Sequence, residues 1–184
     1  MKTKENIINA ISQDDWMMEI LYTVKGLQLT DWCICAGFVR SKVWDVVHGF
    51  SDRTPLPDVD VLYFDDKNIT VEVEKEYEEK LFSIKPNIPW SVKNQARMHL
   101  KSNSEPYISS TDAISKFPET ATAVGVKLDD DNNLILISPL GIDDLINCRV
   151  QPTPTFNNTE KMRMFNNRIK NKRWHDIWHL VNYK

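Results

Sequence analysis

Apolar residues recur along this chain with two different periods. In residues 15–27 they return every three or four positions, which is the repeat of one face of an α-helix. In residues 31–36 they form a short continuous run that ends at Gly37, which is typical of a buried β-strand. The two patterns alternate through most of the chain, so we predict a fold that mixes helices and strands.

The helical repeat and its capping residues predict helices over residues 4–12, 15–27, 39–47, 70–84, 111–117 and 159–173, with shorter helices from residue 96 and within 139–145. Strands are predicted at 31–36, 58–65 and 90–95 and in a hairpin made of 121–128 and 134–138. Polar loops are predicted over 49–57, 101–109 and 151–158. The length of 184 residues suits one domain over 1–150, with a linker and helical extension over 151–184 that packs on it.

Composition narrows the class of protein. Hydrophobic residues make up 41% of the chain and charged residues 27%, as in an ordinary soluble domain. The net charge of -3 gives no overall attraction to nucleic acid or to anionic lipid. The three cysteines include no CxxC pair, and no apolar run is long enough for a signal peptide or a membrane span. We therefore expect a cytoplasmic protein that does not associate with membranes.

Two acids stand at alternate positions in the strand predicted at 58–65. Because side chains of a strand alternate between its faces, Asp58 and Asp60 should lie on one side while Val59, Val61 and Tyr63 lie on the other. Carboxylates about 7 Å apart along one face can share divalent cations, and oxygen ligands favour Mg²⁺ or Mn²⁺. A polar strand face without function is the alternative interpretation.

The strand at 31–36 ends in a tight turn at Gly37, where glycine permits close approach of the backbone to a ligand. The free N–H groups at the start of the next helix can bind an anion. Arg40 and Lys42 lie in the first turns of that helix and could reach phosphate oxygens, although surface ion pairs would explain them equally well.

Together these segments resemble the DNA polymerase β-like nucleotidyltransferase superfamily, whose signature is a small-residue turn after a strand followed by two acids at alternate positions. The chain is more narrowly similar to a bacterial nucleotidyltransferase group, and the similarity spans nearly the whole sequence. It is carried by residues 36–40, 43–45, 58–65, 90–99, 112–126, 139–145 and 172–174.

The resemblance implies an α+β fold, with a mixed sheet flanked by helices in the nucleotidyltransferase palm arrangement. It implies transfer of a nucleoside monophosphate from a nucleoside triphosphate to an acceptor hydroxyl, with release of pyrophosphate. Asp58 and Asp60 would hold Mg²⁺ or Mn²⁺. Gly37, Phe38, Arg40 and Lys42 would bind the nucleotide, and the acceptor could be a small molecule, a protein or RNA.

Three departures from the superfamily pattern leave a second hypothesis open. Phe38 stands where a second small residue is usual, and the gap from Gly37 to Asp58 is longer than usual. Active members carry a third carboxylate on a later strand, where this chain offers Asn94; Asp45, Asp65 or an acid of the helix at 70–84 could replace it. A catalytically inactive module that binds nucleotide or RNA is therefore the alternative function.

The remaining polar candidates have both a functional and a structural interpretation. Asn94 and Arg97 are expected to face the cleft beside the two aspartates and to bind nucleotide, whereas a surface charge is the alternative for Arg97. His175 and His179 have helical metal spacing without a third ligand nearby, so packing is expected there. The basic residues of 161–173 could bind nucleic acid, but the solvated face of an amphipathic helix explains them as well.

Overall fold

A computed structural model describes residues 1–102 and 104–184 of the chain. Its centre is a five-stranded mixed sheet with strand order β3-β2-β1-β4-β5. The parallel pair is β2 with β3, and the other neighbours are antiparallel. The strands are β1 (Cys33–Cys35), β2 (Val59–Tyr63), β3 (Trp90–Asn94), β4 (Gly125–Leu128) and β5 (Leu134–Ile137). The predicted α+β fold is confirmed.

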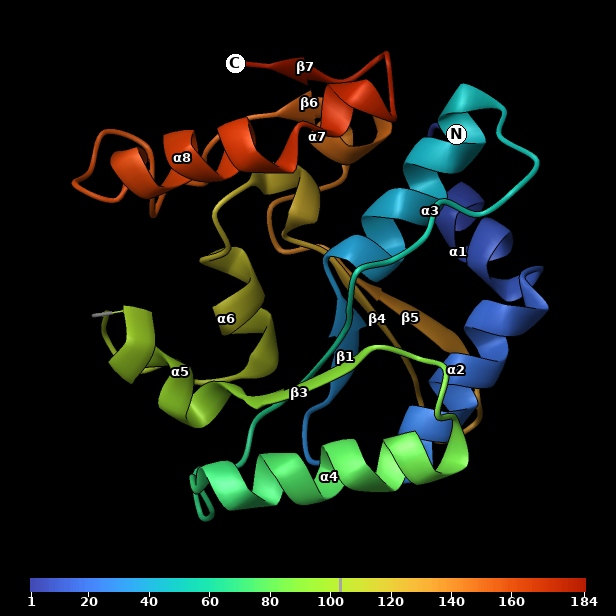
Figure 1. Ribbon diagram of the computed structural model, residues 1–184, viewed down its shortest axis with the longest axis vertical. Coiled ribbons are helices and arrows are strands. Elements are labelled where there is room, and N and C mark those ends of the chain that lie inside the picture. Colours follow the sequence, from blue (N-terminus) through green and yellow to red (C-terminus); the bar gives the residue numbers. More distant parts are fainter. Residues whose placement is uncertain (103) are drawn as a thin grey trace.

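The helices surround this sheet as a ring of separate elements (Figure 1). They are α1 (Lys4–Ser12), α2 (Asp15–Lys25), α3 (Gly37–His48), α4 (Val71–Ile84), α5 (Gln95–Ser102), α6 (Ser110–Ser115), α7 (Asp143–Ile146) and α8 (Met162–Lys172), with 3-10 turns η1 (Thr120–Thr122) and η2 (Trp174–Asp176). N-terminal capping determines where three of these helices begin. The side chains of Thr3, Asp14 and Ser109 accept hydrogen bonds from backbone N–H groups of α1, α2 and α6.

The two faces of the sheet are buried differently. Val59, Val61 and Tyr63 of β2 join the main core, which also holds the buried faces of α1, α2 and α3. The opposite face carries a smaller cluster that includes Cys33, Leu62 and Ile114, the last of which comes from α6. Because α6 covers only part of this second face, the sheet retains an open region beside Asp60.

Residues beyond 150 contribute side chains to the main core. Phe165, Trp174 and Trp178 are buried there, and the ring of Trp178 lies edge-on against Trp44 of α3 with 5.2 Å between centroids. Strands β6 (Arg149–Val150) and β7 (Asn182–Tyr183) pair in parallel and tie the end of the chain to the segment after α7. In Figure 1, α8 and β7 lie at one end of the molecule and α4 lies at the other, with the sheet between them.

Most predicted elements are present with shifted ends. The helix predicted at 39–47 begins at Gly37, and the strand predicted at 121–128 begins only at Gly125. Buried Ala121 and Thr122 belong to the 3-10 turn η1 instead, because a short apolar run does not distinguish a buried turn from a strand. The two-residue strands β6 and β7 were not predicted. Of the loop predicted at 101–109, residue 103 lies outside the described residues, and α5 extends to Ser102.

Candidate active site

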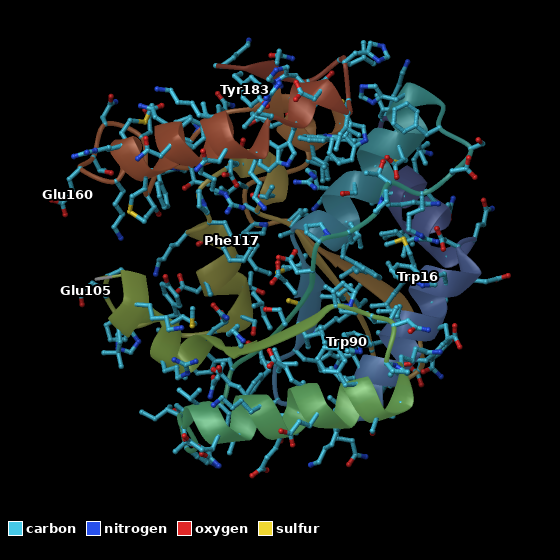
Figure 2. All side chains as sticks on the ribbon, viewed as in Figure 1. Trp16, Trp90, Glu105, Phe117, Glu160 and Tyr183 are labelled. Carbon is cyan, nitrogen blue, oxygen red and sulfur yellow. The ribbon has the colours of Figure 1, made fainter. Side chains whose placement is uncertain are left out.

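A cavity of about 240 Å³ opens on the less covered face of the sheet. Asp60 and Leu62 of β2 form its floor, and Ala36 borders it at the end of β1. The other lining residues are Cys35, Lys93, Gln95, Met98, Phe117, Pro118, Thr122 and Arg168. Phe117 lies on the segment that runs from α6 toward α8 (Figure 2). The cavity therefore brings residues from five regions of the sequence to one carboxylate.

Asp60 has a strongly perturbed environment. Burial raises the pKa of Asp60 to about 6, the negative charge of Asp58 adds to that rise, and the Ser91 hydroxyl opposes it. The negative charge of Asp58 acts on Asp60 from two residues away, while Val59 and Val61 are fully buried on the other face. Asp60 and the two valines thus lie on opposite faces of β2, as predicted. Two neighbouring carboxylates in a partly buried cleft favour a bound cation, which relieves their repulsion.

The turn between β1 and α3 has its unusual backbone at Ala36. Ala36 adopts φ 51° and ψ −112°, a region that glycine favours, whereas Gly37 is the first residue of the helix. A Cβ atom built on Gly37 would meet nothing nearer than Arg40 Nη2 at 3.8 Å. The tight turn was predicted correctly, but the residue that needs glycine-like freedom is Ala36. Strained backbone of this kind often occurs at functional sites.

Phe38 and Arg40 lie inside the protein. The ring of Phe38 is buried and packs near Trp16, so only its backbone can contact a ligand. The Arg40 guanidinium lies over the rings of Trp44, Trp174 and Trp178, at 4.7 to 5.1 Å from their centroids. Burial lowers the pKa of Arg40 to about 10, against the opposing effect of Glu119 and other acids that include Asp58.

Arg40 also retains unused hydrogen-bonding capacity. Its Nη2 donates to the Ser41 hydroxyl at 2.9 Å, and its Nε has no partner among the described residues. Nη2 is the atom that a Cβ built on Gly37 would approach most closely, and the charge of Asp58 acts on the guanidinium. Arg40 therefore lies behind the turn as a buried positive charge, and its contact with phosphate stays a prediction.

Lys42 does not lie at the cleft. Its Nζ donates to Asp14 Oδ2 at 2.8 Å, and Arg53 binds the other oxygen of the same carboxylate. Both contacts border a separate small cavity that includes Asp45 but neither Asp60 nor Ala36. The prediction that Lys42 assists the nucleotide is therefore not supported, because the helical turn from Arg40 to Lys42 carries its side chain to another face of α3.

Asn94 and Arg97 also lie away from the cleft, so the prediction that they face it is wrong. Asn94 shares the strand face of Trp90 and Val92, and its amide donates to the backbone carbonyls of Asp65 and Asn68 at 2.7 and 2.9 Å. Arg97 forms a buried ion pair with Glu74, in which Nε donates to Oε1 at 2.7 Å. The alternation of Trp90 and Val92 was a signal that Asn94 points to the core side.

The residues of β3 that do face the cleft are Ser91 and Lys93. Ser91 is the partner of Asp60 in the parallel register, and Lys93 is the partner of Leu62, so their side chains lie on the same face as Asp60. Lys93 also forms an ion pair with Glu78 of α4 at 3.0 Å. The sequence prediction overlooked both, although the same alternation that assigns Asn94 to the core assigns them to the cleft.

A second group that the sequence prediction did not assign to the cleft comes from the C-terminal part. Arg168 of α8 lines the cavity beside Asp60, and the charges of Arg168 and Lys172 both lower the pKa of Asp60. Glu119, which is fully buried, binds Arg168 Nε and accepts from the Thr122 hydroxyl at 2.7 Å. These residues are far apart in the sequence, and the only sequence signal for them was the basic face of the helix predicted at 159–173.

No third carboxylate completes the pair within the part of the chain that the structure describes, since no three His, Cys, Asp or Glu side chains gather there in a metal-binding arrangement. Asp45 accepts from Thr54 and from Trp178 Nε1 at 2.8 Å, Asp65 accepts from the backbone of Lys67, and Glu74 binds Arg97. His175 contacts Tyr183, whereas His179 contacts His48, so the two histidines have separate neighbours.

A family model described as nucleotidyltransferase matches residues 22–183. The chain belongs to the nucleotidyltransferase family. An NMR structure that reveals a CCA-adding enzyme head domain is 34% identical to it, with a TM-score of 0.90, and the match covers 100% of this chain and 97% of that one. Curated proteins gave no significant match. The family and this fold support a role in nucleotidyl transfer.

Structures of CCA-adding enzymes share the fold at lower identity. The Thermotoga maritima CCA-adding enzyme complexed with tRNA has a TM-score of 0.59 at 14% identity, and the match covers 98% of this chain but 42% of that one. A CCA-adding enzyme with CTP has a TM-score of 0.60 at 14% identity, with 43% of its chain covered. This chain thus spans less than half of those two enzymes. No helix in its described residues combines the length and apolar character needed to cross a bilayer.

Proposed function

We propose that this protein is a metal-dependent nucleotidyltransferase that moves a nucleoside monophosphate from a nucleoside triphosphate to an acceptor hydroxyl. The observation that carries the proposal is the position of Asp60, which lies beside Asp58 on the floor of a cavity that the Ala36 turn also borders. This placement joins the acidic pair to the start of α3, whose first N–H groups have no side-chain cap. This arrangement supports the proposal, because the acidic pair would bind the metal and the start of α3 would bind phosphate at the same opening.

The donor set fits a divalent cation. Asp58 and Asp60 supply hard carboxylate oxygens, and Asp60 is buried enough for its own repulsion from Asp58 to favour a counterion. The Ser91 hydroxyl beside Asp60 is a further oxygen. Bound Mg²⁺ or Mn²⁺ would neutralise the charge that develops on the acceptor oxygen and on the leaving pyrophosphate.

The transfer itself requires one bond to form and one to break. The acceptor oxygen bonds to the α-phosphorus while the bond from that phosphorus to the bridging oxygen breaks, and pyrophosphate leaves with the electron pair. The hydroxyl proton passes to a carboxylate of the Asp58 and Asp60 pair. The N–H groups at the start of α3 and the cations that border the cavity stabilise the phosphate charge during the step.

For the nucleotide and the acceptor, we propose only a general class of molecule. The similar solved structures include CCA-adding enzymes with CTP, with ATP and with tRNA, which makes nucleoside triphosphates the first substrates to test. The acceptor hydroxyl belongs to a small molecule, a protein or RNA. A soluble substrate of this kind fits a cytoplasmic location.

The test is transfer of label from α-³²P nucleoside triphosphates, supplied one at a time with Mg²⁺ or Mn²⁺, to cell extract divided into RNA, protein and small molecules. Asp58→Asn and Asp60→Asn should each abolish labelling while the proteins stay folded by circular dichroism. Asp130→Asn, on the exposed turn between β4 and β5, is the matched control and should label like the native protein. Labelling that survives both active-site substitutions would refute the assignment.

The absence of a third carboxylate among the described residues favours a second candidate, a catalytically inactive module that binds nucleotide or RNA. Such a module would show a rise in melting temperature with nucleoside triphosphate and would leave every fraction unlabelled. The native enzyme should show both the thermal shift and the label. Binding without transfer under all metal conditions would select the module.

A further inference from the structure

One face of α8 is turned toward the opening that holds Asp60. Arg168 lines the cavity beside Asp60, and Met164, Arg168, Asn171 and Lys172 line a second cavity of about 410 Å³. The two cavities share Pro118 and Arg168, so they are neighbours along this helix. Residues 164, 168, 171 and 172 recur at helical spacing and therefore form one face.

The cations of α8 are divided between two faces. Residues 161–173 hold six Lys and Arg and no acid, in a chain whose net charge is -3. Arg168 and Lys172 are one turn apart and lie on the cavity face, whereas Arg163 and Lys170 are exposed on the side opposite to it. Arg168 borders the cavity that contains the Asp60 carboxylate and Lys172 borders the adjoining cavity, a placement that solubility alone does not require.

Arg168 is held in place by a buried acid. Glu119 has no exposed surface, accepts from Arg168 Nε, and accepts from the Thr122 hydroxyl at 2.7 Å on its other oxygen. Within residues 1–102 and 104–184, the Arg168 side chain makes no other hydrogen bond, so its two terminal nitrogens remain available. Thr122 and Arg168 both line the cavity beside Asp60. A guanidinium fixed through Nε presents its remaining donors as a fork suited to phosphate oxygens.

From these contacts we propose that Arg168 and Lys172 form a polyphosphate-binding arm that holds the outer phosphates of the nucleoside triphosphate, with Glu119 as the residue that positions Arg168. This inference rests on the proposed function and names the phosphate-binding part of the same site. The arm faces Asp60 from across the cavity, so the triphosphate lies between the carboxylate pair and α8. The pyrophosphate that leaves is bound by the same two cations.

The first experiment measures binding of inorganic tripolyphosphate by isothermal titration calorimetry at low salt, without metal. Lys172→Ala and Arg168→Gln should each weaken binding by about tenfold or more, as expected for loss of a charged hydrogen bond. Arg163→Gln and Lys170→Ala are the matched controls on the other face and should change affinity less than about threefold. Lys172 is exposed, so its variant tests the arm without risk to the core.

The role of Glu119 has its own readout. Glu119→Gln keeps an oxygen that can accept from Arg168 Nε and should bind tripolyphosphate within about threefold of the native protein. Glu119→Ala, if folded by circular dichroism, should weaken binding about as much as Arg168→Gln. Equal weakening by both Glu119 variants, or by neither, would overturn the positioning role.

The controls also separate this inference from the proposed function. Asp58→Asn and Asp60→Asn should abolish transfer but retain tripolyphosphate binding, because neither aspartate contacts the outer phosphates. If the native protein transfers no nucleotide and still binds tripolyphosphate through Arg168 and Lys172, the enzyme proposal fails and the arm stands. No binding to the native protein, or equal losses in the Arg163 and Lys170 variants, would overturn the arm.

Discussion

Asp60 and Ser91 lie opposite each other on the parallel strands β2 and β3, and the Ser91 hydroxyl stabilises the ionised form of the Asp60 carboxylate. Burial and the neighbouring Asp58 outweigh this help and raise the pKa of Asp60 to about 6. The floor of the cleft therefore carries a carboxylate whose charge is unfavourable until a cation binds. This relationship gives the first prediction.

Asp60→Asn should stabilise the metal-free protein at neutral pH. Because the folded pKa of about 6 lies above the ordinary value of 3.8, the native protein binds the proton more tightly than the unfolded chain, and stability from this group falls as pH rises through that interval. Above pH 6, ionised Asp60 lowers the free energy of unfolding by about 1–3 kcal/mol. Urea unfolding in EDTA compares native protein with Asp60→Asn at pH 7.5 and at pH 4. The variant should be more stable than the native protein at pH 7.5 and equally stable at pH 4.

The same titrations provide an internal control. Asp130→Asn, at an exposed turn, should leave the free energy of unfolding unchanged at both pH values. Mg²⁺ at pH 7.5 should stabilise the native protein and leave the Asp60→Asn variant nearly unaffected, since the donor pair is broken. A stability gain in Asp60→Asn that is equal at both pH values would mean that burial of the charge is not its cause.

The turn between β1 and α3 gives a prediction about two adjacent residues. Ala36→Gly should raise stability by about 1 kcal/mol, because the positive φ of Ala36 costs an L residue with a side chain more than it costs glycine. Gly37→Ala should also fold, since the added Cβ meets no atom closer than 3.8 Å and the residue is helical. Thermal denaturation measures both changes.

Function should separate these two variants. If phosphate approaches the backbone at the start of α3, the Gly37→Ala side chain obstructs it, and the KM for nucleoside triphosphate should rise while stability is retained. Ala36→Val is the matching disruptive change and should lower stability, because a β-branched residue tolerates positive φ poorly. A fully active Gly37→Ala enzyme would show that no ligand comes close there.

The ion pair between Glu74 and Arg97 should act on stability alone. Arg97→Met leaves the buried Glu74 carboxylate without its partner and should cost about 3–5 kcal/mol. The double variant Glu74→Met with Arg97→Met should recover much of that loss, because an apolar pair avoids the unpaired charge. Chemical denaturation measures the cycle. The KM for nucleotide in any variant that folds should match the native value, and a rise would place Arg97 at the substrate after all.

Loss of the Lys42 ion pair should destabilise the protein less than loss of the Arg97 ion pair. Lys42→Ala removes one of two cations on Asp14 and should cost no more than about 1 kcal/mol, since the ion pair is partly exposed. Its affinity for tripolyphosphate should equal that of the native protein. Arg53→Ala, which removes the other partner of Asp14, is the matched control, and a selective loss of affinity in Lys42→Ala would contradict the placement of Lys42 outside the cleft.

Much of the fold and half of the site follow from local sequence. The alternation of residues 58–63 already determined that Val59, Val61 and Tyr63 enter the core while Asp60 faces the other way, because side-chain direction in a strand depends only on neighbouring residues. Helix positions followed from the apolar repeat for the same reason. The turn after β1 was also recognisable, although backbone conformation placed its strain at Ala36 and not at Gly37.

The tertiary structure decided which distant residues share the cleft. Arg168 reaches Asp60, and Glu119 holds Arg168, through contacts across long stretches of chain that no local repeat encodes. Packing likewise joins Arg97 to Glu74, 23 positions earlier in the chain. The carboxylate pair is therefore a property of one short strand, which its own sequence determines. The positive side of the site depends on how α8 docks, because only the folded chain brings its charges to the same opening.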